Sequence, residues 1–527
     1  MAQVGNFTWN STTPASTLNF VPCYQNYSCA RLEVPLDWSD TTNNDTAILA
    51  IIKLSTEVDH SDKRYGGSIV INPGGPGDSG VQEILNRGKI QNIVESSNKE
   101  ERYFDIVSFD PRGVGNTLPP LSCFPDLLSS YLWKEAVQTE GLVDSSEHAE
   151  DYLWSRMQAI GTACTTTAKG SAGIGPYMNT WSTAHDLRHL AQLLQPDSNQ
   201  NARLQYWGYS YGTLLGITYA SLFPDQVHRM VLDGVVDALG CFFRYCHRAG
   251  YPRCAFADAS ANTLSTDEDE TEAISYLQER LTDILADLKI TPLWTSQPSP
   301  EIITYSDVKT LLKTALYAPN DLFPILATIL SDIVQRNASS MAAWKATLRE
   351  ETQPAHCLDS ACQSSAPCRE ACRYGSRIEL TEGIACLDLS QKLFKITQEE
   401  YSELYLQPVL ESSYWIGDTF ADFYMQCASW KGQGPGSFEG PIGAQNMSTP
   451  ILFVSNTLDP VTPLADAHAM SALFKRSVVL EQHAEGHCSY ASRSVCTEHH
   501  IKTYFRTGEL PPEGTRCETE THPFSAE

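Results

Sequence analysis

Residues 204–216 read LQYWGYSYGTLLG, and this stretch decides the fold. LQYWG is a nearly continuous apolar run, which is typical of a buried strand, and TLLGITYASLFP after the turn has the composition of a helix. Ser210 lies at the turn, between Gly208 and Gly212. Larger residues at these two positions would collide where strand and helix cross. The stretch therefore predicts a nucleophile elbow that presents Ser210.

Other short apolar runs place this elbow within a larger sheet. Six of them, separated by helical patterns, occupy the first half of the chain, and two more follow after a long gap. Runs that are apolar throughout indicate strands buried on both faces, and strands alternating with helices indicate a mostly parallel, doubly wound sheet. We therefore expect an α/β-hydrolase fold. The runs are 30–36, 47–55, 67–75, 104–113, 204–210, 229–236, 449–456 and 477–482.

The gap between the two groups of strands predicts an inserted domain. Residues 239–430 are rich in cysteine and mostly helical in pattern, with amphipathic helices expected over 272–288 and 321–335. We call this predicted insertion the cap. The remaining predicted parts are a first core segment, 1–238, and a second core segment, 431–527, which begins with a Gly/Pro-rich linker.

Composition excludes several classes of function. The chain has 527 residues and a net charge of −26, which argues against nucleic-acid binding because phosphates would be repelled. No apolar run is long enough to span a bilayer. No cofactor or metal is expected.

Cysteine usage predicts an oxidising compartment. Sixteen cysteines suggest several disulfides, although an intracellular protein with free thiols is the alternative. The first residues, MAQVGNFTWN, lack the pattern of a signal peptide, so we expect a mature secreted form whose leader has been removed. Six possible glycosylation sites agree with secretion: Asn6, Asn10, Asn26, Asn44, Asn337 and Asn446.

One cysteine cluster, with His356 beside it, resembles a metal site only superficially. The spacing of Cys357, Cys362, Cys368 and Cys372 lacks the paired C-x2-C arrangement of zinc sites, so disulfides are the favoured interpretation. The connectivity stays open, with two candidate pairs, Cys23–Cys29 and Cys123–Cys164.

A serine nucleophile needs a base, and the base needs a carboxylate that fixes its tautomer. Asp459 follows the strand that resumes the sheet, and His487 follows the last predicted strand. The chain order Ser210, Asp459, His487 is the order expected for an α/β-hydrolase. We therefore predict a catalytic triad of these three residues.

Alternatives exist for two triad positions. His483 competes with His487 as the base, and Asp233 or Asp237 could supply the acid from the strand after the elbow. Asp110 is expected instead to hold a turn together with Arg112.

The predicted reaction also needs N–H donors for an oxyanion. VINPGGPGDSG follows an early strand and offers the amides of Gly74 and Gly75, while the amide of Tyr211 follows the nucleophile. Ser79, in the same stretch, mimics a chymotrypsin-type serine motif, but it lies in a loop ahead of a helix in an α/β pattern. We reject it as the nucleophile.

With these motifs in view, the chain resembles the secreted tripeptidyl- and prolyl-aminopeptidase-like α/β-hydrolases, serine peptidases with a TAP-like C-terminal region. The resemblance covers roughly residues 20–240 and 380–500, and it implies a cap over the site and cleavage near a free N-terminus. Cys488 departs from the pattern, because a glycine usually follows the catalytic histidine. The matching stretches are CARLEVPLDW, INPGGPGDSG, FDIVSFDPRGVGNT, WGYSYGT, LDGVVD, GIACLD, CASW and NTLDPVTP.

The resemblance also places the site for the substrate's amino terminus in the cap. Glu382 and Asp388 are the candidate acidic residues, and Tyr209 is a candidate substrate contact beside the serine. Three functions are compatible with these residues. The first is an aminopeptidase acting on a peptide. The second is an esterase, thioesterase or acyl-transfer tailoring hydrolase acting on a small acyl substrate from secondary metabolism. The third is a binding protein that has lost catalysis.

Overall fold

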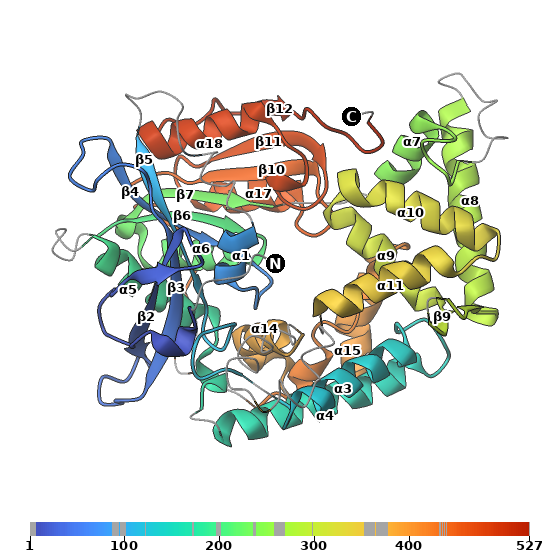
Figure 1. The fold of residues 1–527 in the computed structure, drawn as a ribbon, viewed down its shortest axis with the longest axis horizontal. Helices are drawn as coiled ribbons and strands as arrows, with labels where there is room; N and C mark the ends of the chain where they lie inside the picture. The colour runs from blue at the N-terminus through green and yellow to red at the C-terminus, as the bar shows by residue number, and fades with distance from the viewer. Residues whose placement is uncertain are drawn as a thin grey trace.

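The fold was analysed in a computed structural model of the chain (Figure 1). The structure describes residues 7–525 apart from 87–93, 95–101, 122, 171–172, 196–201, 235–238, 258–268, 298, 353–363, 365–377, 432–433, 435, 437 and 439.

A ten-stranded sheet forms the centre of the molecule, in the order β1-β2-β3-β5-β4-β6-β7-β10-β11-β12. All eight predicted strands lie in it. Two very short edge strands, β1 and β12, were not predicted. The bounds are β1 Val21–Cys23, β2 Tyr27–Pro35, β3 Thr46–Leu54, β4 Tyr65–Asn72, β5 Tyr103–Asp110, β6 Leu204–Tyr209, β7 Val227–Asp233, β10 Leu452–Leu458, β11 Val478–Glu485 and β12 Arg516–Glu518.

Strand direction within the sheet agrees with the predicted fold class. β1, β2, β3 and β5 pair antiparallel, and every pair from β5 onward to β12 is parallel. β7 and β10 are neighbours, with Val231 opposite Leu452, although the whole cap lies between them in the chain. Because parallel strands share one carboxyl edge, the loops after β4, β6, β7, β10 and β11 meet there.

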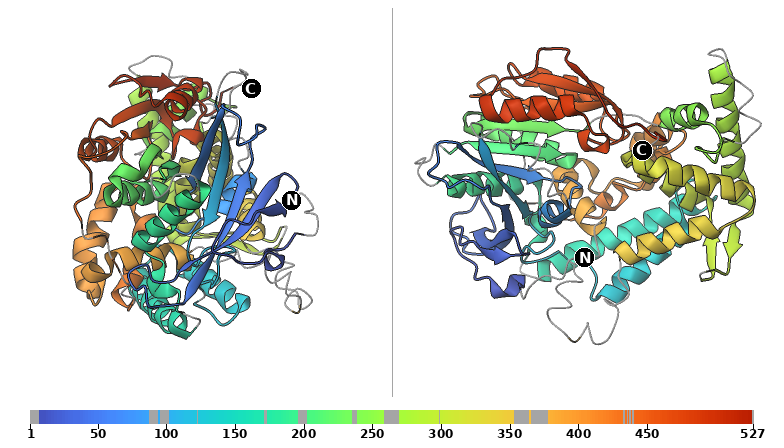
Figure 2. Two further views of the ribbon diagram at one scale, coloured as in Figure 1. Left: turned by 90° about the vertical axis from the view of Figure 1, so that its left-hand side faces the viewer. Right: turned by 45° about the horizontal axis from the view of Figure 1, so that its top comes forward.

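Helices cover both faces of the sheet, as expected for a doubly wound fold (Figures 1 and 2). One apolar core packs the sheet against α1 and α18, and a second packs it against α5, α6 and α17. The bounds are α1 Gly80–Asn86, α5 Thr180–Leu194, α6 Tyr211–Leu222, α17 Leu464–Leu473 and α18 Val495–Thr507.

Most helices of the predicted cap lie beside the sheet and share a core of their own, formed mainly by α7 to α11 (Figure 1). Both helices predicted there from amphipathic patterns are present, as α8 and α10. The bounds are α7 Leu239–Ala249, α8 Asp269–Ile290, β8 Leu293–Thr295, β9 Glu301–Ile303, α9 Tyr305–Tyr317, α10 Pro319–Val334, α11 Ser339–Thr352, α14 Ile378–Leu393, α15 Gln398–Tyr401 and α16 Gln407–Ser412.

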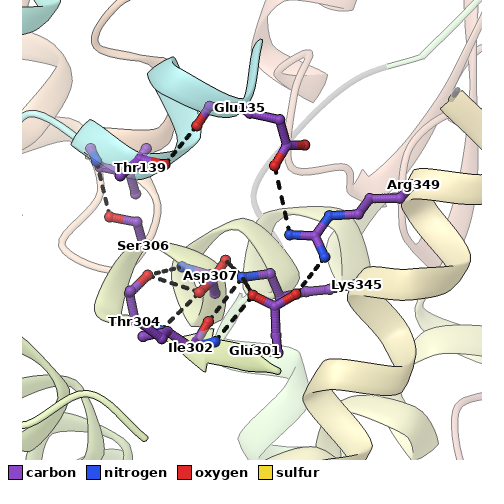
Figure 3. A network of polar contacts seen from close by, with 10 residues as sticks. Glu135, Thr139, Glu301, Ile302, Thr304, Ser306, Asp307, Lys345 and Arg349 are labelled. Atoms are coloured by element: carbon purple, nitrogen blue, oxygen red, sulfur yellow. Dashed lines mark hydrogen bonds and ion pairs between the residues drawn. The ribbon is translucent and has the colours of Figure 1, made fainter. Parts of the chain in front are cut away.

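Two helices from the first core segment, α3 (Leu127–Glu140) and α4 (Ala149–Gly170), run alongside these cap helices (Figure 1). A charged network joins α3 to α9, β9 and α11 (Figure 3). Arg349 contacts both Glu301 and Glu135, and Lys345 lies 3.2 Å from Glu301 and 2.9 Å from Asp307. Single exposed pairs contribute at most about 1 kcal/mol, but a network restrains several elements at once. The cap therefore rests partly on a helix that precedes it by a hundred residues.

Disulfides are present in every part of the chain, and both candidate pairs are confirmed. Cys488 is buried and outside any disulfide, and its thiol donates to the carbonyl oxygen of Asp233 at 3.3 Å. The cluster from Cys357 to Cys372 lies outside the described residues. The bonded pairs are Cys23–Cys29, Cys123–Cys164, Cys246–Cys254, Cys386–Cys427 and Cys496–Cys517.

Two further expectations concern a membrane span and the possible glycosylation sites. Among the described residues, no helix is both long and apolar enough to cross a bilayer. Asn6 lies outside the described residues, and the asparagines at the other five possible glycosylation sites are all exposed: Asn10, Asn26, Asn44, Asn337 and Asn446.

The turn after β5 corrects one prediction. Asp110 is fully buried and accepts hydrogen bonds from the amides of Val81 and Asn116, so it does hold a turn. Arg112, however, does not pair with it. Its guanidinium binds Asp186 of α5 at 2.6 and 2.8 Å. The partner is 74 residues away in the chain, and no local pattern marks it.

Candidate active site

Ser210 lies at a strained turn between β6 and α6. Its φ of 52° and ψ of −124° are outside the regions that residues with a side chain prefer, at a cost of about 1–3 kcal/mol. Its amide donates to the carbonyl of Asp233 at 3.1 Å. A Cβ atom on Gly208 would lie 2.3 Å from the carbonyl oxygen of Gly212, and one on Gly212 would lie 2.6 Å from the carbonyl oxygen of Asn72. Both flanking positions therefore require glycine.

The loop after β4 contacts the elbow directly. A Cβ atom on Gly74 would lie 2.8 Å from the Cβ of Ser210 and 3.1 Å from the amide nitrogen of Tyr211. Gly74 and Gly75 both have positive φ, 109° and 104°. The amide of Gly74 donates to the side chain of Asn72 at 3.2 Å. This contact makes Gly75 and Tyr211 the better candidates for donors to a substrate oxygen.

Asp459 and His487 are brought together by the ends of β10 and β11. The Nδ1 atom of His487 lies 2.8 Å from Oδ1 and 3.0 Å from Oδ2 of Asp459. The amides of Cys488 and Val461 also donate to this carboxylate, at 2.8 and 3.0 Å. With Asp459 fully buried and its oxygens occupied, the carboxylate fixes the Nδ1–H tautomer of His487.

This tautomer leaves Nε2 of His487 as the basic atom. Within the part of the chain that the structure describes, Nε2 is buried and has no hydrogen-bond partner. Its ring lies against Gly234, whose Cβ position would be 3.4 Å from the Cε1 atom. Gly234 directly follows Asp233, the residue that binds the amide of Ser210. Ser210 and His487 therefore both contact the short segment Asp233–Gly234 at the carboxyl end of β7.

The side chains of the alternative acid and base have other partners. Asp233 accepts from the amide and hydroxyl of Ser489, at 2.7 and 2.5 Å, and burial raises its pKa to about 6. Asp237 lies outside the described residues. His483 is exposed and lies 2.9 Å from Glu518 on β12. Ser79 donates to Asp110 at 2.5 Å, which gives it a structural role.

Cap helix α14 is seated on the loop between β4 and α1, residues 73–79, which we call the glycine loop. The hydroxyl of Thr381 donates to the carbonyl of Pro76 at 2.6 Å, and a Cβ atom on Gly77 would lie 2.9 Å from the Cβ of Leu380. Because Gly74 of the same loop contacts Ser210, this seat brings the start of α14 next to the elbow.

The next residue of α14, Glu382, is a buried carboxylate with an unoccupied oxygen. Its side chain is 5% exposed, and among the described residues its Oε2 atom has no hydrogen-bond partner. Burial, with the charges of Asp422 and Glu379, raises the pKa of Glu382 well above its usual range. Glu379 differs, because it accepts from the amide of Cys123 at 3.2 Å and from Ser130 at 3.4 Å. An unpaired buried carboxylate is costly, and a cation is the ligand that would offset the cost.

The two other candidate substrate contacts have partners within the protein. Asp388 accepts from the amide and hydroxyl of Thr180, at 2.9 and 2.5 Å, and this hydroxyl lies 2.6 Å from the hydroxyl of Tyr211. Tyr209 is buried and packs on Trp207 and Tyr490. Asp388 is therefore placed to orient Tyr211 through the hydroxyl of Thr180. Tyr209 is placed to fill the core.

Sequence reasoning missed Asp422, whose charge acts on Glu382, and Tyr317, whose ring lies 5.2 Å from that of His487. No motif surrounds either residue. Only contacts between segments that are distant in the chain mark them.

Two family profiles match the chain, one described as alpha/beta hydrolase fold over residues 67–249 and one as TAP-like protein over residues 412–517. Serine protease Hip1 of Mycobacterium tuberculosis is 27% identical over 93% of this chain and 87% of its own length. Tripeptidyl aminopeptidase of Streptomyces lividans is 32% identical, over 40% of this chain and 35% of its own length. Carboxylesterase B of M. tuberculosis is 25% identical over 93% of this chain and 86% of its own length.

Proposed function

Because this chain belongs to the TAP-like α/β-hydrolases and is a serine hydrolase, we propose that it is an aminopeptidase that releases short N-terminal fragments from peptides. The observation that carries the proposal is the buried, unpartnered carboxylate oxygen of Glu382 on the helix seated against the glycine loop. A carboxylate in this place would bind the ammonium group of a substrate whose scissile carbonyl lies at Ser210.

The proposed reaction begins at Ser210. Its Oγ attacks the scissile carbonyl carbon while the proton moves to Nε2 of His487, and Asp459 stabilises the imidazolium that forms. The oxygen of the tetrahedral intermediate takes up negative charge, and the amides of Gly75 and Tyr211 donate to it. His487 then returns the proton to the leaving amine as the C–N bond breaks.

An acyl-enzyme remains after this step. A water molecule attacks the ester carbon and gives its proton to Nε2 of His487. The imidazolium then protonates Oγ of Ser210 as the C–O bond breaks, releasing the N-terminal fragment as an acid. Every proton taken up by His487 is returned within the cycle, so no cofactor is required by this scheme.

The cap supports an exopeptidase rather than an endopeptidase. The start of α14 contacts the glycine loop beside Glu382, and we propose that these contacts keep a longer chain from passing beyond this residue. We further propose an oxidising, extracytoplasmic location, which the disulfides among the described residues support.

Replacing Glu382 by glutamine is expected to lower kcat/KM for free-amine tripeptidyl amides by roughly 10- to 100-fold, because a charged hydrogen bond in a buried site is worth about 1.5–3 kcal/mol. N-acetylated amides and a simple ester should be unaffected by the substitution. The measurement is a panel of these substrates on the wild-type protein, on Glu382→Gln and on the control Glu379→Gln, whose carboxylate has partners of its own.

Glu379→Gln should keep the preference for free amines, and it should not raise KM for these substrates, because it removes a charge that raises the pKa of Glu382. Cleavage of acetylated and free-amine amides at equal rates by the wild-type protein would contradict the proposal. Serine-dependent ester cleavage without any amide cleavage would instead favour the esterase or acyl-transfer alternative.

Burial of Glu382 also predicts a pH dependence. Because burial raises the pKa of this carboxyl and a bound ammonium group would lower it, binding should favour release of the carboxyl proton. KM for free-amine substrates is therefore expected to fall as pH rises, until the substrate amine itself loses its proton near pH 8. KM of Glu382→Gln should lack this fall. An equal pH dependence of KM in both proteins would refute the role assigned to the carboxyl.

A further inference from the structure

The C-terminal end of cap helix α9 contacts the histidine of the candidate triad. The ring of Tyr317, the last residue of α9, lies 5.2 Å from the ring of His487, with an interplanar angle of 77°. The carbonyl oxygen of Tyr317 accepts a hydrogen bond from the amide of His487 at 3.3 Å. Both the backbone and the side chain of His487 are therefore held by one cap residue.

The residues after Tyr317 extend this contact along the same loop. A Cβ atom on Gly486 would lie 2.7 Å from the Cδ of Pro319, and Gly486 has a φ of 100°. The side chain of Asn320 donates to the hydroxyl of Ser492 at 3.0 Å. The junction between α9 and α10 is thus seated on the loop on both sides of His487.

We infer that Tyr317 is a positioning residue for His487, supplied by the cap, and this inference rests on the proposed role of His487 as the base. The aromatic edge contact limits rotation of the imidazole ring and keeps water from it. The end of α9 acts at the same place, because the C-terminus of a helix carries partial negative charge that stabilises a nearby imidazolium. The cap would then complete the catalytic machinery as well as the substrate site.

The charges around the pair are consistent with this role. Asp459 faces His487 from the end of β10, Asp233 approaches from β7 through Ser489, and Asp78 approaches Tyr317 from the glycine loop. Burial and the charges of Asp459, Cys488 and Asp78 raise the pKa of Tyr317 to about 12. The hydroxyl therefore keeps its proton throughout the working pH range, so the ring rather than a phenolate acts on His487.

The test compares Tyr317→Phe and Tyr317→Ala with the wild-type protein and with Tyr305→Phe. Tyr305 begins the same helix and donates to Asp144 and Asp418, at 3.0 and 2.9 Å, so its loss weakens the cap away from His487. Three quantities are measured. They are kcat for p-nitrophenyl acetate, the acidic side of the pH profile of kcat/KM (the acid limb), and the rate at which a fluorophosphonate labels Ser210.

We expect Tyr317→Phe to stay within about threefold of the wild-type kcat, because the ring is kept. Tyr317→Ala should lose about 10- to 30-fold in kcat and in labelling rate. Its acid limb should also move to higher pH, by about half a unit, since water then reaches the imidazolium and stabilises it. Tyr305→Phe should lower the melting temperature without moving the acid limb.

Three results would overturn the inference. The first is that Tyr317→Ala keeps the wild-type kcat and the wild-type acid limb. The second is that Tyr317→Phe loses as much kcat as Tyr317→Ala does. The third is that Tyr305→Phe shifts the acid limb as far as Tyr317→Ala does. If Tyr317→Ala does not fold, Tyr317→Leu keeps the apolar volume without the aromatic edge and is judged by the same criteria. A wild-type protein that neither cleaves the ester nor is labelled would refute the proposed function itself, which separates the two failures.

Discussion

Replacing Ser210 by alanine is expected to lower kcat by about five to six orders of magnitude, because removing the nucleophile of such a triad leaves only binding and the oxyanion donors. The substitution takes away only Oγ. The turn is held by the amide of Ser210 on Asp233 and by its carbonyl, which accepts from the amide of Thr213 at 2.8 Å, so the fold should persist. The measurement is kcat on a peptide amide and on an ester, with the melting temperature as the check on folding.

Ser210→Gly is the matched control for backbone strain. Glycine adopts the positive φ of this position without steric cost, whereas the Cβ of alanine leaves the strain in place. The free energy of unfolding of Ser210→Gly should therefore exceed that of Ser210→Ala by about 1 kcal/mol. Both variants should be equally inactive. A residual rate in Ser210→Ala above about one hundredth of the wild-type rate would mean that another residue is the nucleophile.

Replacing Asp459 by asparagine is expected to lower kcat by about three to four orders of magnitude. The amide can accept at one atom only, whereas the carboxylate accepts from Nδ1 of His487 and from the amides of Cys488 and Val461. His487 would then be held in the wrong tautomer, with its proton on the atom that must receive the proton of Ser210. The measurement is kcat at a pH where wild-type activity is maximal.

Asp233→Asn serves as the control for this substitution. Asp233 is equally buried and lies nearby, but its oxygens bind Ser489, so its replacement should cost less than tenfold in kcat. A larger loss in Asp233→Asn than in Asp459→Asn would reverse the assignment of the acid.

Most of the sheet could be predicted, because its strands are buried on both faces and are therefore apolar throughout. Strands such as β4 and β10 end in Asn72 and near Asp459, where the apolar run stops and the polar loop begins. β1 and β12, at three residues each, are too short for any periodicity to mark them. Their places depend on pairing with β2 and β11, which is a tertiary property.

The candidate site, like the sheet, has residues that could be predicted from the sequence and residues that could not. Ser210, Asp459 and His487 could be selected because each follows a recognisable strand. Glu382 and Asp388 were indistinguishable as acidic residues of the cap, and only the structure separates the unpartnered oxygen of one from the occupied carboxylate of the other. The partner of Arg112 and the contact of Tyr317 also depend on segments that are distant in the chain.

The pairing of β7 with β10 across the cap also sets the order in which activity arises during synthesis. The ribosome releases the elbow and the first strands early, and domains fold broadly in the order of their synthesis. Asp459 and His487 emerge only after the whole cap and must dock beside strands that are already present. A nascent chain therefore exposes a serine without its base, and the peptidase proposed here would stay silent towards its own unfolded polypeptide until β10 and β11 have been synthesised and have paired.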